Sequence, residues 1–63
     1  MDKKVYRPVW VYISQEFGRV TRLPSVYAYS SLETAIQEGK ARWERIKGDD
    51  KLVHMEIEEI TIL

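Results

Sequence analysis

The chain has 63 residues, with ten basic and ten acidic side chains and a formal net charge of zero at neutral pH. A chain this short forms one domain, residues 1–63, and buries only about 60% of its unfolded surface, so its stability is marginal. The absence of cysteine excludes disulfides and thiol catalysis.

The first half of the chain predicts two strands joined by a turn. Val5 to Ser14 is rich in Val, Tyr, Trp and Ile, which favour strands. Because Pro8 cannot donate to a ladder, we expect regular pairing on both sides to begin only after it. Residues 15–19 are typical of a turn, and residues 19–29 predict a second strand that is bent or broken at residues 23–25.

The middle of the chain predicts a helix from about Ser31 to Lys47. Ser30 followed three residues later by Glu33 forms a capping box, a frequent helix start. Apolar residues share one stripe at helical spacing: Leu32, Ala35, Ile36, Trp43 and Ile46. Gly39 lies near this stripe, where a close approach to the sheet would explain a residue that costs about 1 kcal/mol relative to alanine.

The order strand, strand, helix, strand predicts a two-layer α+β fold, ββαβ, with one helix on one face of a three-stranded sheet. Lys51 to Leu63 reads as the third strand. A crossover helix places this strand parallel to the second and beside the first, in the order 2-1-3. Its apolar residues shift from odd positions to Ile60 and Ile62. We therefore expect a bulge near residues 58–59 or a strand end there, with residues 60–63 docking elsewhere.

Strand alternation sorts the side chains into two faces. We expect the aliphatic face to pack against the helix and form the core. Its members are Val9, Val11, Ile13, Val26, Ala28, Val53, Met55 and Ile57. The other face then carries the aromatic side chains, and the chain has no second helix to cover them.

An uncovered aromatic face is a candidate binding surface, because Trp and Tyr are favoured as anchors. We therefore expect a small non-enzymatic interaction module, a regulator or inhibitor of a larger protein, which binds a protein partner or forms a homodimer. The predicted binding residues are Tyr6, Trp10, Tyr12, Tyr27 and Tyr29, with Arg19 and Arg22 at the rim. The alternative is that these are ordinary strand residues, half-shielded by their neighbours.

A single-stranded nucleic-acid-binding module is the alternative function, since aromatic faces stack bases and Arg7, Arg19 and Arg22 could contact phosphates. Two observations count against it. The net charge is zero, and by parity Glu56 and Glu58 share the aromatic face, where they would repel phosphates.

The charges are distributed unevenly along the chain. Residues 1–31 hold five basic and two acidic side chains, and residues 32–63 hold five basic and eight acidic side chains. Attraction between the two halves explains this asymmetry as well as a binding surface does.

The sequence carries no enzyme signature. It contains no nucleophile elbow and no phosphate-binding glycine loop. His54, Glu56 and Glu58 form only a weak metal or acid–base set, and a solvated strand paired with arginines is the favoured interpretation. We expect no catalytic residue, no metal, no cofactor and no small-molecule substrate. No apolar run approaches the roughly 18 residues of a membrane span, so we expect a soluble, cytoplasmic protein without membrane contact.

Overall fold

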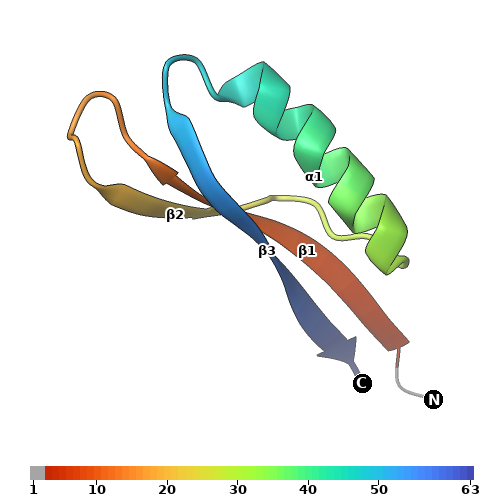
Figure 1. Ribbon diagram of the computed structural model, residues 1–63. Helices are drawn as coiled ribbons and strands as arrows, with labels where there is room; N and C mark the ends of the chain where they lie inside the picture. The colour runs from red at the N-terminus through yellow and green to blue at the C-terminus, as the bar shows by residue number, and fades with distance from the viewer. Residues whose placement is uncertain (1–2) are drawn as a thin grey trace.

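The computed structural model describes residues 3–63 and has the predicted two-layer architecture, a three-stranded sheet with one helix on one face (Figure 1). The elements are β1 (Lys3–Ile13), β2 (Val20–Pro24), α1 (Leu32–Ile46) and β3 (Lys51–Ile62). The order β2-β1-β3 is confirmed, and β1 is antiparallel to both neighbours. β2 and β3 therefore run parallel to each other, as predicted.

Pro8 determines where the chain leaves the sheet after β2. Its carbonyl oxygen accepts a hydrogen bond of 2.8 Å from the Ser25 N–H, but its ring nitrogen has no hydrogen to return a bond. The chain rejoins β1 only at Tyr29, which exchanges backbone bonds of 2.7 and 2.8 Å with Tyr6. On the β3 side, pairing continues through Pro8. The prediction that regular pairing begins only after Pro8 is therefore confirmed on the β2 side of β1 and wrong on the β3 side.

The helix covers the aromatic face of the sheet, which reverses the expected assignment of faces. The indole N–H of Trp10 donates to the carbonyl oxygen of Gly39 at 3.0 Å. The ring of Trp43 lies 6.4 Å from that of Trp10 and 5.2 Å from that of Tyr12, measured between centroids. Trp10 is only 3% exposed. Large aromatic side chains bury about 150–250 Å² each, more than valines do, so covering this face removes more apolar surface from water.

The face opposite the helix, here called the outer face, keeps its central valines from water without a second layer. Val9 is 0% exposed, although it points away from the helix. Arg22 of β2 pairs with Glu56 of β3 at 3.2 Å, across β1, and Arg7 pairs with Glu58 at 2.7 Å. The apolar stems of such long side chains cover the valines beneath them. These ion pairs join the basic half of the chain to the acidic half.

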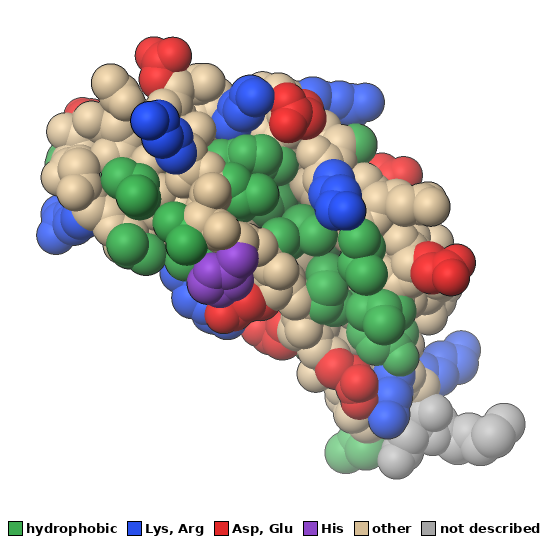
Figure 2. Space-filling view, in the orientation of Figure 1, with side chains coloured by type: hydrophobic (Ala, Val, Ile, Leu, Met, Phe, Trp, Pro, Cys, Tyr) green, Lys and Arg blue, Asp and Glu red, His purple; other side chains and the backbone are tan. Residues whose placement is uncertain are grey.

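Only part of the predicted core is buried. The residues predicted for it that are exposed are Ile13, Val26, Ala28 and Val53. Val26 and Ala28 are exposed because their segment has left the sheet, so the second strand is shorter than predicted. Met55 and Ile57 are half-buried on the helix side, where Figure 2 shows hydrophobic side chains gathered along the seam between β3 and α1.

β3 is one continuous strand as far as Ile62, so neither alternative predicted for its end is correct. Its pairing with β1 is regular over residues 57–62, and the register shift lies further back, after Val11, where Val53 is the extra residue of β3. Ile60 reaches the outer face by ordinary alternation, opposite Val5. The apolar side chains change face there without a bulge.

The helix is capped by Ser31, one residue later than the predicted capping box. The Ser31 side-chain oxygen accepts from the Thr34 N–H at 3.5 Å, so Ser30 and Glu33 do not form the box. At the other end Gly48 has a φ of +54°, the left-handed geometry expected of a glycine that ends a helix.

Replacing Ser31 with alanine is expected to lower the free energy of unfolding by about 1 kcal/mol, because the first helical N–H groups lose their side-chain acceptor. Ser30→Ala, one residue earlier, is the matched control and should have little effect. Urea denaturation of both variants measures the difference. Equal losses, or a larger loss at Ser30, would contradict the position of the cap.

Candidate functional site

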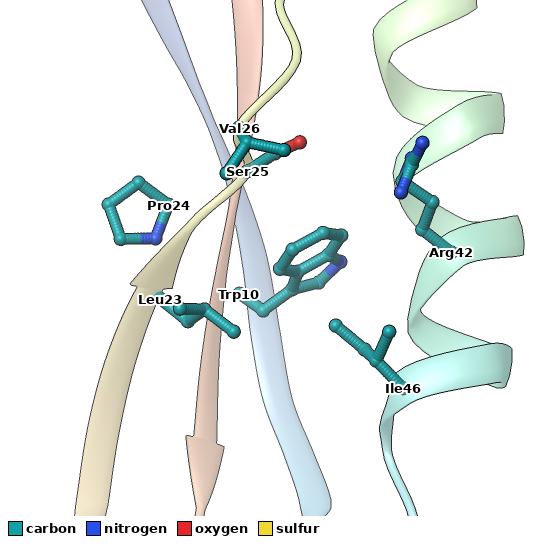
Figure 3. Close-up of a pocket in the computed structure, with 7 residues that line it drawn as sticks. All are labelled: Trp10, Leu23, Pro24, Ser25, Val26, Arg42 and Ile46. Carbon is teal, nitrogen blue, oxygen red and sulfur yellow. The ribbon is translucent and has the colours of Figure 1, made fainter.

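A groove opens between β2 and the C-terminal half of α1, because the helix packs against β1 and β3 and leaves the β2 side uncovered. Its volume is about 190 Å³. Trp10 forms its floor between the strands and the helix (Figure 3). This β2–α1 groove is lined by Trp10, Leu23, Pro24, Ser25, Val26, Arg42 and Ile46.

The walls of the β2–α1 groove are apolar and reach solvent. Leu23 is 40% exposed, Ile46 48% and Val26 89%. Leu23 and Ile46 point toward Trp10 from opposite sides (Figure 3). Removing apolar surface of this kind from water contributes roughly 25 cal/mol per Å², and the part that exceeds the cost of association appears as affinity. The groove is therefore a place where an added apolar side chain would be favourable.

Arg42 stands at the rim of the groove in a supported position. Its guanidinium carbon lies 4.1 Å from the centre of the Tyr27 ring, a cation–π contact. A hydrogen bond with the Tyr29 side chain, with a smaller contribution from Tyr27, raises the pKa of Arg42 above its ordinary value. Among residues 3–63, no acidic side chain pairs with Arg42. The rim thus presents a fixed positive charge.

The sequence predicted that the aromatic face of the sheet is uncovered, and this prediction is wrong. Trp10 and Tyr12 lie against Trp43 of the helix instead, and Tyr6 is half-buried beside Tyr29. The stacking platform that the nucleic-acid alternative required is consequently under α1.

The other predicted binding residues lie at different places around the molecule. Tyr27 and Tyr29 support Arg42 at the groove. Arg19 lies over the ring of Phe17 in the turn before β2, 5.5 Å from its centre. Arg22 points to the outer face, where Glu56 holds it. Of all the predicted binding residues, only Trp10 lines the groove, and Tyr27 and Tyr29 adjoin it through Arg42.

Sequence reasoning missed every lining residue of the groove except Trp10. Ile46 was predicted only as part of the apolar stripe of the helix, and Val26 was predicted for the core. No pattern in the sequence singled out Arg42. The one local signal for the groove is the predicted bend or break of the second strand at residues 23–25, where β2 ends.

His54, Glu56 and Glu58 share one face as predicted, but it is the outer face, with Val9, and not the aromatic face. This follows from the pairing, in which even residues of β3 lie opposite odd residues of β1. The His54 Nε2 atom lies 3.2 Å from Oε1 of Glu56. Within the described residues, no three His, Asp or Glu side chains are arranged to hold a metal ion.

The pKa of Glu56 is lowered from its ordinary value of 4.5 by hydrogen bonds with His54 and then with Arg22. A lowered folded-state pKa contributes stability that is present above pH 4.5 and is lost as the pH falls through the folded value. We expect Glu56→Gln to have a lower free energy of unfolding than wild type at pH 7, and we expect this difference to shrink at about pH 2.5. Urea denaturation of both proteins at both pH values measures the difference. A difference that does not change with pH would contradict the hydrogen bonds of Glu56.

Comparison of the chain with protein-family models, with curated proteins and with solved structures finds no match. Over residues 3–63, no helix has both the length and the apolar character needed to cross a membrane. The functional proposal is therefore built on the geometry and charge of the β2–α1 groove.

Proposed function

We propose that the protein is a non-enzymatic interaction module that docks a partner protein in the β2–α1 groove. The observation that carries the proposal is an apolar groove of about 190 Å³ with a buried tryptophan floor and solvent-exposed walls. Binding energy at protein interfaces concentrates where one anchor side chain fills such a pocket. Arg42 at the rim adds a polar contact that orients the occupant.

The size of the groove favours a side chain over a metabolite. An engineered apolar cavity of about 150 Å³ accepts benzene, so the groove has room for one leucine, methionine or phenylalanine side chain. Sites for small-molecule ligands usually measure about 300–1,000 Å³. Docking without chemistry makes such a module a regulator or inhibitor of the protein to which it binds.

Selection of a phage-displayed library of random peptides on the wild-type protein tests the proposal. We expect the enriched peptides to share one large apolar residue. Fluorescence anisotropy then compares their binding to wild type, to Ile46→Glu and to Phe17→Glu. Phe17 is also an exposed apolar residue but lies in the turn before β2, outside the groove, which makes it the matched control.

The glutamate at position 46 should weaken binding by about tenfold or more, because it places a charge in the apolar wall. The control should bind as wild type does, and circular dichroism establishes that both variants are folded. Peptides without a shared apolar residue, or equal losses in the two variants, would contradict docking in the groove.

A further inference from the structure

We infer that the β2–α1 groove takes an extended acidic segment of the partner, which pairs with the outer edge of β2 and presents a carboxylate to Arg42. This inference rests on the proposed function and specifies the chemistry of the partner. Three features support it: a free strand edge beside the groove, a match of spacings, and an unpaired positive charge.

The outer edge of β2 is free for pairing. Among the described strands, β2 pairs only with β1. Arg19 and Ser25, the residues just before and just after β2, make backbone hydrogen bonds with Ser14 and Pro8, on the β1 side. Because successive residues of an antiparallel strand direct these groups to opposite sides, Val20 and Arg22 direct their N–H and C=O groups outward. Exposed edges of this kind bind extended peptides as an added strand.

An added strand would place alternate side chains on the groove side of the sheet. The residue opposite Leu23 would lie about 5 Å from it and would enter the groove beside Ile46. The residue two positions along lies roughly 7 Å further. Arg42 precedes Ile46 by about one helical turn, or roughly 6 Å, and α1 runs alongside β1 (Figure 1). One apolar and one acidic side chain, two residues apart, would therefore reach Ile46 and Arg42 together.

The charge on this side of the molecule favours an acidic occupant. Residues 17–32, which include β2 and one wall of the groove, contain no acidic residue. The Arg42 guanidinium lies against the Tyr27 ring, and no carboxylate within residues 3–63 pairs with it. A guanidinium that is already positioned can bind a carboxylate through two hydrogen bonds without first being ordered.

The peptides enriched in the library selection, resynthesised with acetylated and amidated ends, test the inference. We expect them to carry Asp or Glu two residues from the apolar anchor. Arg42→Gln should weaken binding about tenfold, and Arg45→Gln, a change at an exposed position of the same helix, should not. Replacing the acidic residue of the peptide with its amide should cause the same loss, and the two changes together should cost no more than either alone.

N-methylation of the peptide backbone tests the strand pairing separately. Methylation of the N–H groups that face β2 should abolish binding, while methylation of the alternate N–H groups should be tolerated.

Apolar peptides that bind without an acidic residue and do not respond to Arg42→Gln would overturn this inference and leave the proposed function standing. Enriched peptides that share no large apolar residue would overturn both this inference and the proposed function. A wild-type dimer in sedimentation that Ile46→Glu dissociates would assign the groove to a second copy and overturn the acidic-segment inference.

Discussion

Replacing Trp10 with alanine is expected to lower the free energy of unfolding by about 3–5 kcal/mol, a large part of the total. The Trp10 ring is buried between β1 and α1, contacts Trp43, and donates to the Gly39 carbonyl oxygen. Truncating a buried tryptophan to alanine costs about 3–5 kcal/mol. At about 0.05–0.15 kcal/mol per residue, a domain of this length has only about 3–9 kcal/mol of stability. The substitution therefore removes at least about a third of the total.

Thermal melting followed by circular dichroism measures this effect. Val26→Ala is the control, because it also truncates an apolar residue at the groove but one that is almost fully exposed. We expect Val26→Ala to melt as wild type does and Trp10→Ala to melt at least about 10 °C lower. Trp10→Ala melting within a few degrees of wild type would contradict the packing of α1 on the aromatic face.

Gly39→Val is expected to have the second largest effect, a loss of about 2–3 kcal/mol. A Cβ atom at Gly39 would lie 2.6 Å from Sδ of Met55 and 2.9 Å from Cβ of Pro8. The Met55 side chain is flexible and can move, but the Pro8 ring is fixed by its own backbone in β1. Overpacking of this kind costs about 1–3 kcal/mol and outweighs the gain in helix propensity over glycine.

Lys40→Val is the matched control for Gly39→Val, because it introduces the same side chain at the next residue of the helix, where the position is exposed. Urea denaturation should give a loss of only a few tenths of a kcal/mol for Lys40→Val, from helix propensity alone. Similar midpoints for the two variants would mean that α1 does not approach β1 closely at Gly39.

The order and pairing of the elements were predictable because each depends on local patterns. A strand-rich run, a turn, a helical stripe and a second strand-rich run permit few three-stranded arrangements. Which face packs against the helix was not predictable from alternation, because both faces of β1 are apolar at its centre. The decisive features were the bulk of Trp10 and the close approach of α1 to Met55 and Pro8 at Gly39, and these meet only in the folded protein.

The β2–α1 groove was less accessible to sequence reasoning than the fold. The pattern at residues 23–25 predicted that the second strand is bent or broken there, but not that Val26 and Ala28 lie outside the sheet. The extra residue at Val53 carries no local signal. The contact of Arg42 with Tyr27 joins positions 15 residues apart in sequence, and no pattern within either segment indicates it.

Hydrogen exchange at the Trp10 indole, followed by NMR, tests most directly whether this side chain is buried. Both the core and the floor of the groove require a buried ring whose N–H is bonded to Gly39. The Trp10 indole proton should exchange only when the domain unfolds, at a rate that urea increases in step with global unfolding. If this proton exchanged at the rate of a free indole, the ring would lie in water. That result would contradict both the packing of the core and the floor of the groove.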